Sequence, residues 1–254
     1  MRRRLDAELV AQGLAQSRGH AQELITSRRV TVSGAPALKA SRQVDPSEPI
    51  RVLGPPPRFV SRAGLKLELG LTEFGIDPSG AHAIDIGSST GGFTDCLLQH
   101  GAASVLSVDV GTNQLHEKMR TDARVTVMEN TNIRSLTLDD FADDPARGGG
   151  FSVVVADLSF TSTRAMLGHF ATLLAPTGNA VVLVKPQFEA GRQEVSKGKG
   201  IIRDKSIWVR VLHEFIDAAI EVGLVVVGLE LSPITGGKGN VEFLAHIVHQ
   251  DILD

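Results

Sequence analysis

The chain has 254 residues, of which 42% are hydrophobic and 22% charged, which is typical of a globular protein with one large domain or two unequal ones. Cys96 is its single cysteine, so an internal disulfide is excluded, and a reducing compartment, by default the cytoplasm, is expected. No apolar run approaches the roughly 18 to 20 residues of a membrane span, and Asp6 and Glu8 interrupt the place where a signal peptide needs an apolar segment.

The net charge of −3 conceals two parts of opposite charge. Residues 1–60 contain ten Lys and Arg against five Asp and Glu, a net +5, and the remaining residues contain 16 against 24, a net −8. A small basic module joined to a larger acidic one predicts a polyanion-binding part attached to a part with another task. A solvated basic face without a partner is the alternative.

The basic module is predicted to be a small α+β domain of two helices and a short sheet. Leu5, Leu9 and Leu14 recur at helical spacing, and a second helix is expected to begin after Ser17, its candidate N-cap. Alternating strands are expected at residues 30–34 and around residues 50–52.

A proline-rich stretch at residues 54–57 forbids a helix and supplies stiff, extended chain. It predicts a boundary near residue 60. We therefore expect a polyanion-binding domain at residues 1–57, a linker at 58–61 and a larger domain at 62–254.

In the larger domain, apolar runs bounded by turn residues alternate with helical patterns. Strands are predicted at residues 81–86, 104–108, 124–128, 152–156, 179–184, 224–229 and 241–248. Helices are predicted at residues 62–75, 92–100, 161–174 and 205–222. This alternation predicts an α/β, Rossmann-like, doubly wound domain with a mostly parallel sheet covered by helices on both faces. The glycine-rich stretch at residues 191–200 is predicted to be a loop, either a mobile lid or an ordinary solvated segment.

Residues 84–93 lead from a strand through a glycine-rich turn into a helix, which is where α/β sheets bind nucleotides. The spacing alone fits both NAD and S-adenosylmethionine. A carboxylate at Asp85 would disfavour a pyrophosphate, whereas S-adenosylmethionine carries a sulfonium, an amine and no phosphate. Asp109, at the end of the next strand, stands where an acid would bind ribose hydroxyls. We therefore expect S-adenosylmethionine, with a turn carboxylate and an ordinary strand-end carboxylate as the alternatives for Asp85 and Asp109.

The third strand is followed by Asn130-Thr131-Asn132, whose amides are candidates for contacts to the adenine edge. The residues assigned to cofactor binding are Asp85, Gly87, Ser89, Thr90, Gly91, Phe93, Asp109, Val110, Asn132 and Asp157.

Polar residues lie at or beside the ends of three further strands: Asp157, Lys185 and Glu242. A lysine that closes an apolar strand is unusual, because lysine is almost never buried unless it is paired. Asp157 and Glu242 are available partners. Lys66, on the helix that leads into the sheet, is a candidate second cation, and a solvated helix lysine is its alternative.

Four residues and three motifs resemble a known family: Lys66, Asp157, Lys185 and Glu242, with residues 85–93, 157–160 and 184–189. The family is the TlyA family of ribosomal RNA methyltransferases, long described as haemolysins. Its catalytic domain is similar to the FtsJ (RrmJ) type of ribose 2′-O-methyltransferases, which carry a Lys-Asp-Lys-Glu tetrad. The resemblance covers nearly the whole chain.

The N-terminal module resembles the RNA-binding module first recognised in ribosomal small-subunit protein four, through residues 4–6, 13–18 and 30–34. This resemblance implies that Arg4, Arg18 and Lys39 contact the phosphate backbone of RNA.

Arg134 and Phe160 lie just past strand ends near the predicted pocket and are assigned to RNA binding. Phe160 is expected either to stack on an extruded base or to pack in the core.

The resemblance implies 2′-O-methylation of a cytidine in ribosomal RNA, with ribosomal subunits as partners and no membrane or metal. Members that modify both subunits carry short terminal extensions. Large-subunit RNA is therefore the expected substrate of this chain, and small-subunit RNA is the second candidate. Lys185 would accept or orient the hydroxyl proton, and Asp157 and Glu242 would fix the lysines. The alternatives are a non-catalytic RNA-binding assembly factor, a membrane-acting haemolysin and a small-molecule methyltransferase. Both a monomer and a homodimer fit the sequence.

Overall fold

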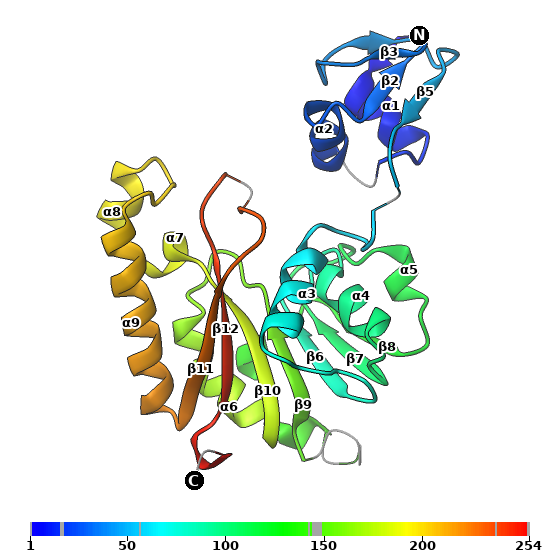
Figure 1. Ribbon diagram of the computed structural model, residues 1–254. Helices are drawn as coiled ribbons and strands as arrows, with labels where there is room; N and C mark the ends of the chain where they lie inside the picture. Colours follow the sequence, from blue (N-terminus) through cyan, green and yellow to red (C-terminus); the bar gives the residue numbers. More distant parts are fainter. Residues whose placement is uncertain are drawn as a thin grey trace. The chain divides into compact units, whose positions relative to one another are not determined.

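The computed structural model describes residues 2–15, 18–55, 57–141, 143, 149–236 and 238–252. The chain forms two compact units, Met1–Pro56 and Pro57–Asp254 (Figure 1). Residues 58–61, expected as a linker, belong to the second unit, because Phe59 and Val60 are buried in its core. The backbone N–H of Val60 also donates to Asp95 Oδ2 at 2.8 Å.

The first unit is the expected pair of helices with small antiparallel sheets. Its elements are β1 (Arg3–Arg4), α1 (Leu5–Ala11), α2 (Arg18–Thr26), β2 (Val30–Val32), β3 (Ala35–Pro36), β4 (Gln43–Val44) and β5 (Ile50–Val52). The strands pair in the orders β3-β2-β5 and β1-β4. Leu5 and Leu9 of α1 pack with Leu24 and Ile25 of α2 in one buried core. Ser17, the expected N-cap, lies outside the described residues.

The second unit alternates strands and helices as expected. Its elements are α3 (Ala63–Glu73), β6 (His82–Ile86), α4 (Gly92–Gln99), β7 (Ser104–Val108), α5 (Glu117–Arg120), β8 (Val125–Met128), β9 (Phe151–Ala156), α6 (Leu167–Leu173), β10 (Leu174–Val184), α7 (Pro186–Glu189), α8 (Arg192–Lys197), α9 (Lys205–Glu221), β11 (Leu224–Leu231) and β12 (Phe243–His249). Short 3₁₀ helices lie at Ile133–Ser135, Leu138–Phe141, Arg164–Met166 and Gln250–Ile252. In the described part of the chain, no helix is long and apolar enough to cross a bilayer.

The seven strands form one sheet in the order β11-β12-β10-β9-β6-β7-β8. The pairs β10–β9, β9–β6, β6–β7 and β7–β8 are parallel, and β12 is antiparallel to both β10 and β11. This arrangement confirms the mostly parallel α/β domain. It also brings the carboxyl ends of the parallel strands to one edge, where ligands bind in such sheets.

Helices cover both faces of this sheet (Figure 1). Because successive residues of a strand point to opposite faces, Ala83 packs in one core with α3 and α4, and Ile84 and Ile86 pack in another with α6 and α9. Asp85 consequently shares the α4 face with Ala83.

Two expectations for local structure were wrong. Residues 191–200 contain α8, whose side chains are not buried and which is tied to α9 by Arg210 Nη2 donating to Glu194 Oε2 at 2.6 Å. This helix lacks an apolar stripe, so its periodicity could not indicate it. β10 begins at Leu174 rather than at residue 179, with an irregular register between Leu174 and Asn179.

Candidate functional site

Two adjoining cavities lie at the carboxyl edge of the sheet. The first has a volume of about 430 Å³ and the second about 560 Å³. Asp157, Ser159 and Phe160 line both. The segment that follows β9 therefore forms a wall common to the two cavities.

The glycine-rich turn between β6 and α4 forms the floor of the first cavity. Gly87 has a φ of +80°, and a Cβ there would lie 3.0 Å from the backbone oxygen of Asp157. Gly91 caps α4 with a φ of 89°, and a Cβ there would lie 2.8 Å from Leu115. Both positions combine left-handed backbone with a close approach, which is why glycine fits them.

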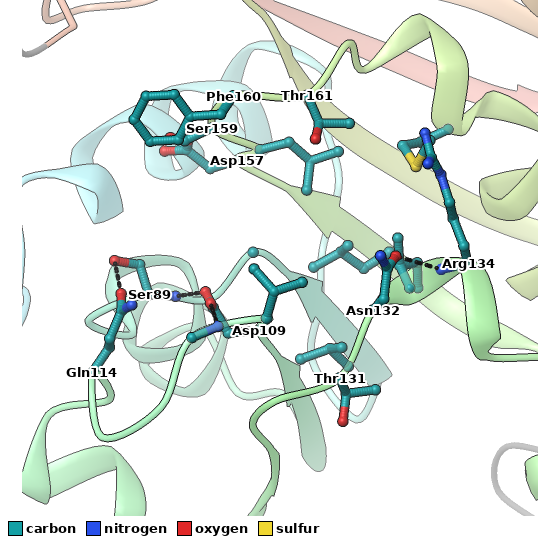
Figure 2. Close-up of a pocket in the computed structure, with 18 residues that line it drawn as sticks. Ser89, Asp109, Gln114, Thr131, Asn132, Arg134, Asp157, Ser159, Phe160 and Thr161 are labelled. Atoms are coloured by element: carbon teal, nitrogen blue, oxygen red, sulfur yellow. Dashed lines mark hydrogen bonds between the residues drawn. The ribbon is translucent and has the colours of Figure 1, made fainter.

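Asp109 organises the rim of this turn (Figure 2). Its Oδ2 accepts the backbone N–H of Ser89 at 2.7 Å, and its Oδ1 accepts that of Gly111 at 2.7 Å. A bound pyrophosphate needs turn amides such as that of Ser89 as donors. Here that amide is already directed at a carboxylate, which favours a ligand without phosphate.

The remaining wall of the first cavity combines apolar and polar side chains. Val110, which is 68% exposed, and Ile133 offer apolar surface, and Asn132 offers an amide whose Oδ1 accepts the backbone N–H of Arg134 at 3.1 Å (Figure 2). Ligand sites are typically cavities of about 300 to 1,000 Å³ with apolar walls and a few polar groups. The residues present fit an adenosyl group.

Asp85 lies behind the cavity rather than in its lining. Its Oδ2 accepts the backbone N–H of Thr94 at 2.9 Å and the Thr94 hydroxyl at 2.6 Å, both on α4. Burial raises the pKa of Asp85 to about 7, although the Thr94 hydrogen bonds act in the opposite direction. The expected contact of Asp85 with the cofactor is thus replaced by support of the helix that follows the turn.

The other residues assigned to the cofactor are divided between the two cavities and the core. Gly87, Ser89, Asp109, Val110, Asn132 and Asp157 line the first cavity. Thr90 lines the second cavity, Gly91 caps α4 and is not among the residues that line either cavity, and Phe93, on α4, is 2% exposed in the core. Thr131, in the segment expected beside the adenine, also lines this cavity. Gln114 and Met166 line it without having been assigned to it, and they lie outside any motif.

The second cavity brings Lys66, Asp157, Lys185 and Glu242 together. Lys66 Nζ lies 2.6 Å from Glu242 Oε2 and 3.4 Å from Asp157 Oδ2. Lys185 Nζ lies 2.5 Å from Asp157 Oδ1. All four side chains are largely buried, so the two lysines and two carboxylates form one chain of alternating charge in which each ion has a partner.

Two oxygen acceptors contact the ammonium group of Lys185. Besides Asp157, Nζ donates to the backbone oxygen of Leu158 at 2.7 Å. A lysine ammonium has three N–H donors. Within the described residues, the third donor is available to a molecule bound in the cavity.

Phe160 lines both cavities and therefore stands at their border. It is 91% exposed, with a φ of 63°, and its ring centroid lies 5.6 Å from that of Phe188. The alternative of a core aromatic was therefore wrong. Gln187 and Phe188 line the second cavity and lie two and three residues after Lys185 in its motif, so their place could have been read from the sequence.

The candidate RNA contacts of the first unit are organised by a buried acid. Arg4 donates to both oxygens of Asp6 at 3.0 and 2.9 Å, and Arg18 donates to Asp6 Oδ2 at 3.1 Å. Hydrogen bonds from Arg4 hold the pKa of Asp6 well below its usual range. The Arg4 and Arg18 side chains stay 43% and 59% exposed, and Lys39 is exposed between β3 and β4.

Comparison with known proteins finds relatives over almost the whole chain. The FtsJ-like methyltransferase family matches residues 59–248, and the S4 domain family matches residues 3–50. The chain is 47% identical to YqxC of Bacillus subtilis, which carries a provisional rRNA methyltransferase name, over 96% of this chain and 85% of that protein. It is 42% identical to the 16S/23S rRNA (cytidine-2′-O)-methyltransferase TlyA of Mycobacterium tuberculosis, over 95% of this chain and 88% of that protein. A solved Streptococcus thermophilus protein with a provisional hemolysin name is 42% identical, with a TM-score of 0.78, over 98% of this chain and 89% of that one.

Proposed function

Because this chain belongs to the FtsJ-like methyltransferase family, within its TlyA group, we propose that it transfers a methyl group from S-adenosylmethionine to the ribose 2′-hydroxyl of a cytidine in ribosomal RNA. The charge-alternating chain of Lys66, Asp157, Lys185 and Glu242 beside the first cavity carries this proposal. Large-subunit RNA is the first candidate substrate and small-subunit RNA the second. The enzyme would act in the cytoplasm on ribosomal subunits.

S-adenosylmethionine supplies an electrophilic methyl group on a sulfonium. Asp109 would hold its ribose hydroxyls, and Val110, Ile133 and Asn132 would enclose its adenine. Asp157, which lines both cavities, stands at the passage where a methyl group would cross from one to the other.

Lys185 would orient the attacking hydroxyl through its remaining N–H donor, and the hydroxyl proton would pass to water as the new O–C bond forms and the S–C bond of the sulfonium breaks. Asp157 and the backbone oxygen of Leu158 fix the direction of its ammonium group, and Lys66 and Glu242 fix Asp157 in turn. Holding two reactants in line can contribute about 7 to 11 kcal/mol, more than the roughly 10²- to 10⁴-fold typical of base catalysis. Positioning is therefore the larger contribution expected from these residues.

RNA would be held at two kinds of contact. Arg4, Arg18 and Lys39 of the first unit would meet phosphates. Phe160 would stack on the base of the target nucleotide once it is extruded, and Arg134, at the mouth of the first cavity, would contact the adjoining backbone.

The test is transfer of a labelled methyl group from S-adenosylmethionine to unmodified small subunits, large subunits and free ribosomal RNA. We expect label on the ribose of one cytidine, and a loss of at least about 10²-fold in kcat for Lys185→Ala with its cofactor dissociation constant nearly unchanged. Lys205→Ala, at the exposed start of α9, is the matched control and should behave as the wild type. Cofactor binding without label on any substrate would overturn the proposal and favour a non-catalytic RNA-binding factor.

A further inference from the structure

Residues 158–163, here called the Phe160 loop, connect β9 to the helices that follow and are held at both ends by side chains of a single later segment. Lys185 Nζ donates to the backbone oxygen of Leu158 at 2.7 Å. At the other end, Glu189 Oε2 accepts the hydroxyl of Ser162 at 2.5 Å, and its Oε1 accepts the backbone N–H of Thr163 at 2.6 Å.

Glu189 lies at the end of α7, outside the Lys66–Asp157–Lys185–Glu242 chain, and is 8% exposed. Both of its oxygens are used on the Phe160 loop, 26 and 27 residues away in sequence. Hydrogen bonds to a carboxylate are short and about twice as strong as neutral ones. A largely buried carboxylate whose two oxygens both accept hydrogen bonds from one loop indicates that the conformation of this loop matters for function.

The conformation that Glu189 holds is an unfavourable one. Phe160 has a φ of 63°, in the left-handed region that bulky side chains rarely adopt. Its ring is 91% exposed, so burial of the ring does not compensate for the backbone strain. Strained conformations of this kind persist only where the surrounding contacts over-determine them, and they cluster at functional sites.

We propose that Glu189 is a positioning residue for the substrate nucleotide, because it clamps the Phe160 loop so that the ring of Phe160 stays at the border of the two cavities. This inference rests on the proposed RNA methylation. Glu189 touches neither reactant in this scheme and acts only through Phe160. Its loss should therefore have no further effect on RNA turnover once the Phe160 ring is gone.

The test is a double-mutant cycle on kcat/KM for the ribosomal substrate, using the full chain, Phe160→Ala, Glu189→Ala and the double variant. We expect Glu189→Ala to lower kcat/KM about tenfold in the wild type and by less than about twofold in the Phe160→Ala background. Glu221→Ala, which removes an exposed carboxylate at the end of α9, is the control and should leave kcat/KM unchanged in both backgrounds. If Glu189→Ala does not fold, Glu189→Gln replaces it, because it removes the charge and keeps the volume.

A second measurement does not depend on catalysis. Amide hydrogen exchange of residues 158–166 should be faster in the Glu189 variant than in the wild type or in Glu221→Ala. Equal exchange rates, or an equal loss of kcat/KM in both backgrounds of the cycle, would overturn the inference. If the wild type methylates no RNA, the proposed function fails by itself, and the exchange measurement still decides whether Glu189 clamps the loop.

Discussion

The carboxyl group of Asp85 is enclosed between β6 and α4. Because its pKa is about 7 in the folded protein, the free energy of unfolding depends on its protonation. An unfolded chain loses this proton near pH 4, whereas the folded chain keeps it until about pH 7. The stabilisation that the protonated Asp85 carboxyl contributes to the free energy of unfolding is therefore fully present below about pH 4. It is lost at about 1.4 kcal/mol per pH unit as the pH rises toward 7, beyond which it changes no further.

Asp85→Asn should abolish this dependence, because an amide of the same shape can still accept the two Thr94 hydrogen bonds through its oxygen. The measurement is the free energy of unfolding in urea at pH 5, 6, 7 and 8 for both proteins. We expect the wild type to lose stability relative to the variant up to about pH 7. Parallel profiles would show that Asp85 titrates at its ordinary pKa.

The side-chain roles were only partly predictable from the sequence. The alternation of β6 already places Asp85 on the face opposite Ile84 and Ile86, so its orientation toward α4 was contained in the pattern. The expected cofactor contact of Asp85 rested on the positive charge of S-adenosylmethionine and not on this alternation. The acids and lysines at strand ends were predictable as a group, because the carboxyl ends of parallel strands share one edge. Their pairing was not, since it depends on distances between β9, β10, α3 and the segment before β12.

At the scale of elements, the turn between β6 and α4 combines a left-handed backbone with a close approach at Gly87. Gly87 and Gly75 both have a positive φ, of 80° and 66°, but only Gly87 has a neighbour, the Asp157 backbone, close to the place of a Cβ, whereas a Cβ at Gly75 would have nothing within 4 Å. This pair separates the cost of the backbone conformation from the cost of the close approach.

Gly87→Ala and Gly75→Ala should each lose about 1 to 2 kcal/mol of unfolding free energy from the left-handed backbone. Only Gly87→Ala should also weaken S-adenosylmethionine, by about tenfold or more in calorimetric titration, because the added methyl displaces the wall that carries Asp157. Equal cofactor affinity in the two variants would show that the approach of the turn to Asp157 has no part in cofactor binding.

Elements with a strong apolar pattern were predicted, and those held by polar contacts were not. The strands β6, β7 and β9 and the helix α9 have continuous apolar runs or an apolar stripe, and they lie within a few residues of their expected bounds. The short helix α8 depends on Glu194 and Arg210, a contact between two segments that no local pattern reveals.

At the scale of the whole molecule, the basic first unit and the acidic second unit assign electrostatic binding and chemistry to different parts of the chain. Lys39→Ala should reduce the slope of log K against log salt for RNA binding by about 0.9 for duplex or 0.7 for single strands, and leave the methylated nucleotide unchanged. Arg124→Ala, in the second unit, is the control, because Arg124 precedes β8 at the amino end of the strand, away from the carboxyl edge that carries the candidate site. A changed methylation site with an unchanged slope would contradict a phosphate contact at Lys39.

The place of β12 in the sheet has a consequence for the synthesis of the protein. Glu242 lies directly before β12, which enters the sheet between β10 and β11, and Lys66 reaches this carboxylate across 176 residues of sequence. A chain emerging from the ribosome folds its earlier segments first. Lys66 and Asp157 are therefore in place long before Glu242 exists, and a nascent chain lacks the complete set of ion pairs. Until Glu242 has emerged, Lys66 lacks the carboxylate that lies 2.6 Å from its ammonium group, and under the proposed function the group of catalytic side chains is incomplete.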